Sequence, residues 1–310
     1  MKVFWTKEEL DILKDCYKHQ ATATEIQEKI PNHTVGASMT KASELGLTKR
    51  YIKKNNAQYK ADYQNYDWCY DKFIVQGKTL QQIADETGYG LRVLEKWMYE
   101  KHHISNKTYR KLARLTPIQY SIILAGTLGD GHIDKREKYA IYIESHADNQ
   151  KDYLFWKYDI LRNLCLSEPK RYNAATRTFN NRQYFCQGGY RIETRAIDEL
   201  KIIRDKTISE RIEELDELGF CTHMLDDAYR SGDSWIICLG DWTQDEIEKY
   251  ITVVYTKFNF FPKQQKDKRY VRFCSEESNI IDTIILSHIP NDLDIIQDKI
   301  IKRQRFGVIY

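Results

Sequence analysis

One short segment of this 310-residue sequence constrains the fold more than any other feature. Residues 122–131, IILAGTLGDG, form an apolar stretch that ends in Asp130 and a glycine. Thr116–Pro117, an N-cap residue followed by a residue suited to the first helical turn, marks the helix start. Residues four apart lie on one helix face, so the small residues Ala125 and Gly129 would let a second helix approach closely. The segment predicts a helix interface with an acid at its C-terminal end.

A second copy of this pattern lies further along the chain. Residues 215–227 form an amphipathic segment that ends in Asp226 and Asp227. Thr222 and Asp226 take the two interface positions, and Asp227 takes the position of Asp130. A carboxylate is unfavourable at the negative end of a helix dipole unless a cation compensates it. A plain helix end with a surface aspartate would account for either copy alone, but the repetition favours a shared divalent-metal site.

The order of the elements after each acid is also repeated. The sequence patterns predict a hairpin, a long aromatic helix, a second hairpin and a further helix in both copies. These elements are expected at 131–144, 148–164, 170–194 and 195–203 in the first copy, and at 229–239, 243–258, 259–275 and 276–286 in the second. A repeated supersecondary unit predicts an α+β protein with two similar halves.

Both motifs and the repeat resemble the LAGLIDADG homing endonucleases in their two-repeat, single-chain form. The resemblance covers residues 115–301, and one position departs from the family pattern, because Ala228 stands where the family usually has Gly. It implies an α+β fold in which two pseudo-symmetric αββαββα halves, residues 115–207 and 208–302, follow the N-terminal helical part. The two motif helices would pack at the centre with their acids side by side.

The resemblance also implies a function. It implies a site-specific endonuclease that cuts double-stranded DNA at a long asymmetric target, with Asp130 and Asp227 holding Mg²⁺ beside the two scissile phosphates across the minor groove. Phosphodiester hydrolysis needs an activated water and neutralised phosphate charge, which a carboxylate-bound metal supplies. The family often has a catalytic lysine near each acid, and our candidates are Lys206 in the first half and Lys299 in the second. Because one chain carries both motif helices, we expect a monomer.

The N-terminal part predicts two helical DNA-binding modules. In residues 1–50, Thr6 and Glu9 form a capping-box pattern before the first of three short helices. The module resembles Myb-like helix-turn-helix domains, in which the third helix enters the major groove. The expected base-reading residues on that helix are Ser38, Thr40, Lys41 and Ser43, although such residues are also typical of a solvated helix face.

Residues 51–65 are basic and polar and predict a linker, and residues 66–112 predict a second helix-turn-helix module. Its turn is expected at 88–90, and Arg92 and Lys96 on the following helix would face DNA. Residues 1–115 carry 20 Lys and Arg against 14 Asp and Glu, whereas the remainder carries 28 against 31. The positive excess lies where phosphate contacts are expected, although a mildly basic solvated surface has the same charge.

Basic hairpins in both halves fit binding in a DNA groove. Strand alternation would point Tyr270 and Arg272 toward DNA, and Val271 and Phe273 toward the core. The full set of expected DNA contacts in the two halves consists of Arg177, Arg182, Arg191, Lys263, Lys268 and Arg272. Charged hairpins are often only solvated, so each of these residues is a separate hypothesis.

Composition argues against several other classes of protein. The seven cysteines never form a C-x-x-C pair, which argues against a zinc site or a disulfide framework. No apolar run reaches the roughly 20 residues of a membrane helix, and the N-terminus lacks the apolar core of a signal peptide, so we expect a cytoplasmic protein without a membrane partner.

Two alternative functions stay open. One is a non-cleaving member of the same fold, either an intron maturase or a DNA-binding regulator. The other is a helix-turn-helix repressor with a ligand-sensing domain, which leaves the repeated acids unexplained.

Overall fold

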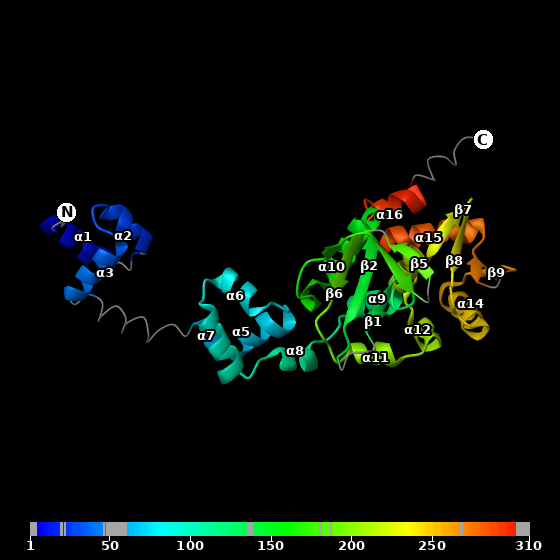
Figure 1. The fold of residues 1–310 in the computed structure, drawn as a ribbon, viewed down its shortest axis with the longest axis horizontal. Helices are drawn as coiled ribbons and strands as arrows, with labels where there is room; N and C mark the ends of the chain where they lie inside the picture. Colours follow the sequence, from blue (N-terminus) through cyan, green and yellow to red (C-terminus); the bar gives the residue numbers. More distant parts are fainter. Residues whose placement is uncertain are drawn as a thin grey trace. The chain divides into compact units, whose positions relative to one another are not determined.

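The computed structural model describes residues 5–18, 21, 23–45, 47, 61–134, 139–179, 182–186, 188–266 and 269–301. The chain divides into two compact units, Met1–Trp68 and Cys69–Tyr310, and each is described by itself. Figure 1 shows the fold and labels most of the helices and strands. Most of the expected linker, residues 51–60, lies outside the described residues. Within the described ranges, no helix combines the length and the hydrophobicity that a bilayer span requires.

The first unit holds three short helices, α1 (Lys7–Lys18), α2 (Ala23–Lys29) and α3 (Val35–Glu44). The expected capping box is confirmed, since the Thr6 amide donates to Glu9 Oε2 at 2.9 Å and the Glu9 amide donates to Thr6 Oγ1 at 3.1 Å. Apolar faces of the three helices enclose a small core of Leu13, Cys16, Ile26, Ile30 and Ala42. Our expectation for Ser38 was wrong, because its side chain is buried in this unit and is not available to read a base.

A second helical region follows in the chain. It comprises η1 (Asp62–Gln64), α5 (Tyr66–Tyr70), η2 (Asp71–Val75), α6 (Leu80–Thr87), α7 (Leu91–Glu95), η3 (Lys96–Lys101) and α8 (Asn106–Leu112). Thr79 caps α6, and Gly88 ends it with a φ of 73°, which a residue without Cβ adopts at little cost. The helices expected on either side of the 88–90 turn are therefore present, and their role in DNA binding stays a prediction.

The part of this helical region that belongs to the second unit, from Cys69 on, packs directly on the first half of the repeat. Arg195 donates to the Gly77 carbonyl at 3.2 Å and to Asn106 Oδ1 at 2.8 Å. The Tyr109 hydroxyl donates to the Asn163 carbonyl at 2.9 Å, and a Cβ at Gly77 would lie 1.7 Å from that oxygen. Residues 66–112, expected as a module of their own, therefore belong almost wholly to the second unit.

The two halves of the repeat follow in order. The first comprises α9 (Pro117–Gly126), β1 (Gly131–Ile133), β2 (Tyr142–Ala147), η4 (Asp148–Gln150), α10 (Lys151–Leu161), η5 (Arg162–Leu164), β3 (Lys170–Tyr172), β4 (Ala175–Phe179), β5 (Arg182–Cys186), β6 (Gly189–Glu193) and α11 (Leu200–Asp205). After α12 (Ile208–Glu214), the second comprises α13 (Glu217–Asp227), β7 (Ala228–Ser231), β8 (Ser234–Cys238), α14 (Gln244–Phe258), β9 (Lys263–Gln264), β10 (Tyr270–Arg272), α15 (Ser275–His288), α16 (Asp294–Ile296) and η6 (Gln297–Ile301). As expected, Thr116 caps α9 and Pro117 is its first residue.

Both halves share one sheet topology. Each has a four-stranded antiparallel sheet, in the order β1-β2-β6-β3 in the first half and β7-β8-β10-β9 in the second. The residue after each motif acid begins a hairpin, so that Gly131 pairs with Glu144, and Ala228 pairs with Ile237. The predicted α+β fold with two pseudo-symmetric halves is confirmed.

Two details differ from the expectation. Helix α9 ends at Gly126, and residues 127–130 form a turn. Gly126 and Gly129 have low helix propensity, and the Thr127 hydroxyl donates to the Leu124 carbonyl at 2.7 Å within this turn. The second hairpin of the first half is also divided, because β4 and β5 form a two-stranded sheet of their own beyond β3 and β6.

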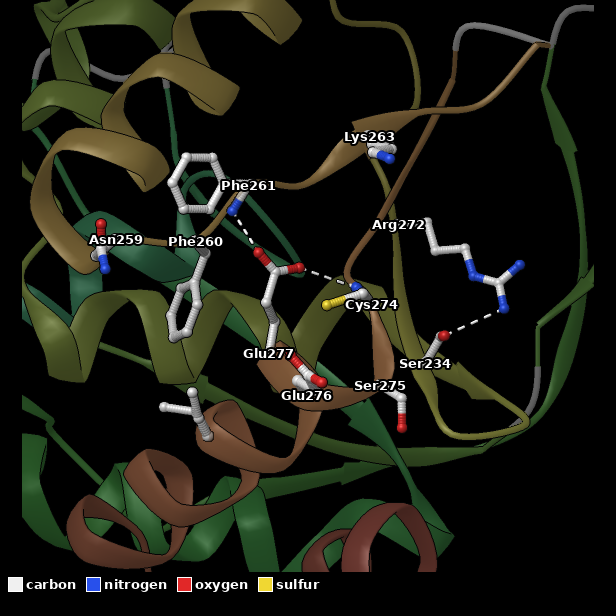
Figure 2. A pocket seen from close by; sticks show the side chains of 11 residues that line it. Ser234, Asn259, Phe260, Phe261, Lys263, Arg272, Cys274, Ser275, Glu276 and Glu277 are labelled. Atoms are coloured by element: carbon white, nitrogen blue, oxygen red, sulfur yellow. Dashed lines mark hydrogen bonds between the residues drawn. The ribbon is translucent and has the colours of Figure 1, made fainter.

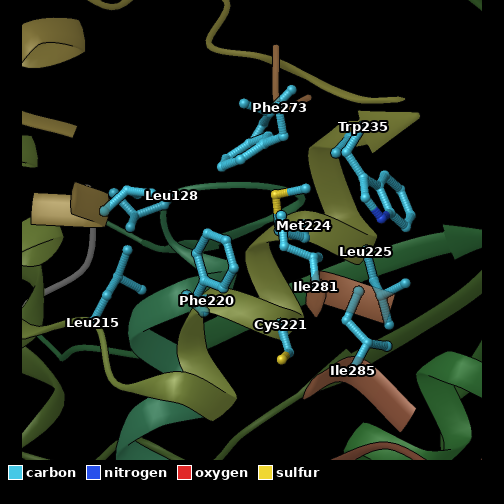
Figure 3. Packing of buried hydrophobic residues seen from close by; sticks show 14 of the residues in the cluster. Leu128, Leu215, Phe220, Cys221, Met224, Leu225, Trp235, Phe273, Ile281 and Ile285 are labelled. Atoms are coloured by element: carbon cyan, nitrogen blue, oxygen red, sulfur yellow. The ribbon is translucent and has the colours of Figure 1, made fainter. Parts of the chain in front are cut away.

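The largest core surrounds the second motif helix. Figure 3 shows Phe220, Cys221, Met224 and Leu225 of α13 with Trp235 of β8, Phe273, and Ile281 and Ile285 of α15. Leu128, which follows α9, belongs to the same cluster. The apolar core of the second half therefore extends to the first motif and fixes the two motif segments together.

Candidate active site

The two motif segments meet where the two halves join. Helices α9 and α13 pack against each other, and the expected interface residues Ala125 and Thr222 are fully buried. A Cβ at Gly129 would lie 2.8 Å from Asp226 Cβ and 2.9 Å from Asp227 Oδ2. The absence of a side chain at Gly129 therefore brings the acids of both motifs together.

Asp130 lies at the open side of this contact. Its side chain is 40% exposed, and its Oδ2 lies 3.6 Å from His146 Nδ1. Partial burial and the nearby charge of Asp226 raise the pKa of Asp130. A carboxylate whose ionised form is opposed by a like charge is one that a bound cation would stabilise.

Asp226 is the innermost acid of the group. Its side chain is fully buried, and Lys157 donates to Oδ1 at 2.8 Å and to Oδ2 at 3.1 Å. The Tyr153 hydroxyl also donates to Oδ1, at 2.9 Å. Burial opposes the charge of Lys157, but Asp226 and Glu144 outweigh burial and raise the pKa of the ammonium group. Asp226, expected as an interface residue, therefore also forms a buried ion pair.

Two residues of β2 complete the network around Lys157. Glu144 is fully buried and accepts hydrogen bonds from Lys157 and, at 2.7 Å, from the Tyr142 hydroxyl. His146 Nε2 lies 2.8 Å from Glu144 Oε1, and His146 Nδ1 lies 3.0 Å from Gln150 Oε1. Burial would raise the pKa of Glu144, but Lys157 and His146 outweigh it and lower the pKa, so this carboxylate stays charged.

Asp227 has a less polar environment. Its side chain is 27% exposed, and its Oδ2 lies 3.5 Å from Nδ1 of the fully buried His223. His223 stacks on Trp242 and packs edge-on against Tyr250, and neither its ring nitrogens nor the Tyr250 hydroxyl has a hydrogen-bond partner among the described residues. Burial, followed by the charges of Asp226 and Asp130, raises the pKa of Asp227 to about 7. Burial lowers the pKa of His223 to about 3.

The two lysines expected in the site have different surroundings. Lys299 donates to the carbonyls of Leu225 and Ala228 at 2.7 Å each, so its ammonium group caps the end of α13. Lys206 donates instead to Glu214 Oε1 at 2.6 Å. Within the described part of the chain, the lysine bonded to a motif aspartate is Lys157.

Our sequence reasoning missed Lys157, although the sequence holds a signal for it. The buried residues of α10 are Tyr153, Leu154, Lys157, Tyr158 and Leu161, which share one helix face. A lysine at a core position of an amphipathic helix predicts a buried partner, because lysine is almost never fully buried unless it is paired. Glu144 and His146 gave no such signal, since β2 is buried on both faces over most of its length.

The donor set of the site fits a divalent cation. Asp130, His146 and Asp226 each offer one ligand atom, and these atoms lie within 4.8 Å of one another. Four carboxylates, from Asp130, Glu144, Asp226 and Asp227, face two ammonium groups, from Lys157 and Lys299. Burial and the charge of Asp226 raise the pKa values of Asp130 and Asp227, so a bound dication would stabilise the ionised forms of both acids.

Several of the basic residues expected to contact DNA lie exposed on the two sheets. On β6, the exposed Arg191 precedes the buried Ile192. On β10, the exposed Arg272 lies between the buried Val271 and Phe273, as the alternation predicts. Lys263 and Arg272 line a pocket of about 720 Å³ beside the start of α15, where Arg272 donates to Ser234 Oγ at 3.1 Å (Figure 2).

The other expected DNA contacts are less fully described. For Arg177 and Arg182 the structure describes the backbone alone, in β4 and β5, and Lys268 lies outside the described residues. Lys41 pairs with Glu44 on α3, at 2.9 Å. Arg92 and Lys96 are exposed on α7 and at the start of η3. The DNA contacts of these residues stay predictions.

The sequence pattern of a known family covers this site. The model of the LAGLIDADG DNA endonuclease family matches residues 120–281, which is more than half of the 310 residues. The chain belongs to the LAGLIDADG DNA endonuclease family. No curated protein matches the sequence of this LAGLIDADG chain at a significant level.

Solved structures resemble this LAGLIDADG protein in fold. The homing endonuclease I-WcaI bound to its DNA recognition sequence matches with a TM-score of 0.50 and 17% identity, over 69% of this chain and 96% of I-WcaI. Full-length DUF199/WhiA from Thermatoga maritima matches with a TM-score of 0.35 and 10% identity, over 60% of each chain. I-DmoI in complex with DNA and Ca matches with a TM-score of 0.34 and 8% identity, over 55% of this chain and 90% of I-DmoI.

Proposed function

We propose that this LAGLIDADG protein is a monomeric, site-specific endonuclease that cuts both strands of a long, asymmetric DNA target across the minor groove. The observation that carries the proposal is the contact at Gly129, where Asp227 Oδ2 lies 2.9 Å from the position of a Cβ on the residue that precedes Asp130, close enough for the charge of Asp130 to raise the pKa of Asp227. The two strands of a duplex run in opposite directions, so two pseudo-symmetric acids suit one cut in each strand. Because α9 and α13 already pair within one chain, a second copy is not needed.

Asp130 and Asp227 are the proposed metal ligands on the open side of the site. Both side chains are partly exposed, whereas that of Asp226 is fully buried. A divalent cation such as Mg²⁺ would supply phosphate neutralisation and a water of lowered pKa. The protein itself holds the acids in place, since Gly129 permits the close approach and Lys299 caps the end of α13. Lys157 and Lys299, and not Lys206, would supply the positive charge beside the motif acids.

The sheets supply the proposed DNA surface. Arg191 of the first half and Lys263 and Arg272 of the second are exposed on strands of the two main sheets. Basic side chains in such positions bind phosphates and contact base edges in the grooves. Arg92 and Lys96 in the helical region would add phosphate contacts beyond the cleavage site.

The departure from the family motif at Ala228 is compatible with this function. Ala228 has φ −98° and ψ 154°, an extended conformation that does not require glycine. Its methyl group is buried where β7 begins. A second copy of the motif with Ala at this position therefore ends its helix without strain.

Substitution of the two acids tests the proposal. A target is first selected by sequencing the products cleaved from a randomised duplex library with Mg²⁺. On that target, Asp130→Asn and Asp227→Asn each remove a metal-binding charge with little change of shape. Each variant should bind the duplex like wild type and lose double-strand cleavage, because one strand lacks its acid.

Asp233→Asn, in the exposed turn between β7 and β8, is the matched control and should cut like wild type. Wild-type cutting rates in both acid variants would show that the site is wrong. A library from which the wild-type protein retains bound duplexes but yields no cleaved products would assign the chain to the non-cleaving alternative, a maturase or a regulator of the same fold.

A further inference from the structure

The first half holds a histidine beside its motif acid, close enough for both side chains to bind one metal ion. His146 is buried on β2, and its Nδ1 lies 3.6 Å from Asp130 Oδ2. Together with Asp226, these residues bring one ligand atom each to within 4.8 Å of one another, from three separate elements. The group thus has one imidazole nitrogen and two carboxylates.

The histidine is also held in the way that metal-binding histidines usually are. Its Nε2 lies 2.8 Å from the buried Glu144, which is held in turn by Lys157 and by the Tyr142 hydroxyl. A carboxylate that accepts from the far nitrogen fixes the ring orientation and turns the near nitrogen, Nδ1, toward Asp130. Nδ1 donates to Gln150 Oε1 at 3.0 Å, so a metal at Nδ1 would displace one proton and replace this contact.

Lys157 does not prevent Asp226 from binding an ion. Lys157 and the Tyr153 hydroxyl donate to Asp226 Oδ1 at 2.8 and 2.9 Å, and Lys157 also donates to Oδ2 at 3.1 Å. An ionised carboxylate offers about four acceptor positions, so a position on Oδ2 stays open for an ion. An ion bound at that position would contact carboxylates of both motifs, Asp130 and Asp226.

We propose that Asp130, His146 and Asp226 form a mixed nitrogen and oxygen site that binds a first-row transition-metal dication in preference to Mg²⁺. Imidazole strengthens binding of transition metals, whereas Mg²⁺ prefers oxygen ligands and retains its waters. In the second half Leu239 takes the position of His146, and the imidazole beside Asp227 is that of His223, whose Nδ1 lies 3.5 Å from Asp227 Oδ2. Among the described residues, the group of one imidazole and two carboxylates is the one beside Asp130. This inference deepens the proposed function, because it assigns a metal preference to one of the same two acids.

The test uses the full-length protein without DNA, with Mn²⁺ as the probe. Pulsed electron paramagnetic resonance detects the ¹⁴N nucleus of a histidine bound to Mn²⁺, and calorimetry with Mn²⁺, Co²⁺ and Mg²⁺ gives the affinities. The variant is His146→Gln, whose amide can still donate to Glu144 but offers no imidazole nitrogen. His132→Gln, at an exposed position on β1, is the matched control.

We expect a ¹⁴N signal in wild type and in His132→Gln, and its loss in His146→Gln. His146→Gln should bind Mn²⁺ and Co²⁺ about tenfold more weakly, with little change for Mg²⁺. A wild-type protein that binds no Mn²⁺, or whose ¹⁴N signal is absent or survives in His146→Gln, overturns the inference. The proposed function is judged separately by the acid variants: if those lose cleavage while no ¹⁴N signal exists, the histidine site alone is refuted.

Discussion

The two halves of this protein share a backbone and differ in the polar groups around their motif acids. In the first half, Glu144 pairs with the residue after the motif acid, and His146 follows it on the same strand. In the second half, Ile237 and Leu239 take these positions. The same strand register therefore presents a carboxylate and an imidazole to one acid, and two aliphatic side chains to the other.

The helices that follow differ in the same way. Lys157 lies four residues after Tyr153 on α10, whereas Val254 lies four residues after Tyr250 on α14, and all four side chains are buried. The Tyr153 hydroxyl donates to Asp226, while the Tyr250 hydroxyl has no hydrogen-bond partner among the described residues. The first half thus surrounds the acids with an ion-pair network that the second half lacks.

The comparison shows that the repeat determines the sheet topology of each half. The charge around each motif acid depends instead on a few inward-facing side chains. Sheet order and register are equal in the two halves because strand pairing depends on the alternation of apolar residues. The charge around each acid depends on three positions per half. These are Glu144, His146 and Lys157 in the first half and Ile237, Leu239 and Val254 in the second, and the strand order is the same in both.

The largest effect is expected from removal of the buried cation in the first half. Lys157→Met leaves the buried Glu144 and Asp226 without their partner, and should lower the free energy of unfolding by about 3 to 5 kcal/mol. Urea denaturation measures this change. Lys206→Met is the matched control, because Lys206 and Glu214 form a partly exposed pair, and it should cost about 1 kcal/mol or less. Equal costs for the two variants would contradict the view that the buried network around Lys157 stabilises the fold more than a partly exposed ion pair does.

In the second half, removal of a charged side chain should raise the free energy of unfolding. The pKa of Asp227 is raised from 3.8 to about 7, so the unfolded chain releases this proton near pH 4 while the folded chain keeps it until about pH 7. Ionisation therefore favours unfolding as the pH rises through this window. Asp227→Asn removes the penalty and should stabilise the metal-free protein at pH 8 by on the order of 2 to 4 kcal/mol, with no difference below pH 4.

Denaturation in the presence of a chelator, at pH 4 and at pH 8, measures the effect of Asp227→Asn. Asp233→Asn makes the same chemical change at an exposed turn and should match wild type at both pH values. If Asp227→Asn is less stable than wild type at pH 8, the carboxylate has a stabilising partner, and the two acids are more alike than the structure indicates.

The contact that joins the halves should give a smaller effect. Gly129→Ala places a methyl group 2.8 Å from Asp226 Cβ, so the motif segments must separate, at a cost of about 1 to 3 kcal/mol. Gly36→Ala, on α3 with nothing within 4 Å, should leave the first unit as stable as before or up to about 1 kcal/mol more stable. If Gly129→Ala unfolds in urea like wild type, Gly129 does not lie in the interface between the two motif segments.

The sequence predicted the helices and strands around the site better than it predicted the side chains that contact the motif acids. Apolar periodicity placed both motif helices and the repeated order of strands, because these patterns are local. It also placed Arg272 outward and Val271 inward on β10, as observed. The partners of the acids were not predictable in this way, because Lys157, Glu144 and His146 come from separate elements that only the folded sheet and α10 bring together.

Packing between regions was also beyond the sequence. Residues 66–112 have the turn and the helices of an independent module, and nothing local indicates that Gly77 lies against Asn163. Arg195 looked like the start of a helix, whereas it bonds to the Gly77 carbonyl and lies 3.5 Å from the centre of the Tyr109 ring. Such contacts depend on shape complementarity, which a one-dimensional pattern does not encode.

The smallest effect concerns that docked helical region, which adds a further difference between the halves, since its described contacts are with the first half. If α7 meets DNA, Arg92→Gln with Lys96→Gln removes two phosphate contacts, and the slope of log affinity against log salt should fall by about 2. Fluorescence anisotropy on the selected target at several salt concentrations measures the slope. Lys201→Gln with Lys249→Gln removes the same charge from α11 and α14, where both lysines pair with acids, and should leave the slope unchanged. Equal slopes for the two double variants would mean that the helical region supports the first half without touching DNA, and the asymmetry of the halves would then be confined to the acids and their partners.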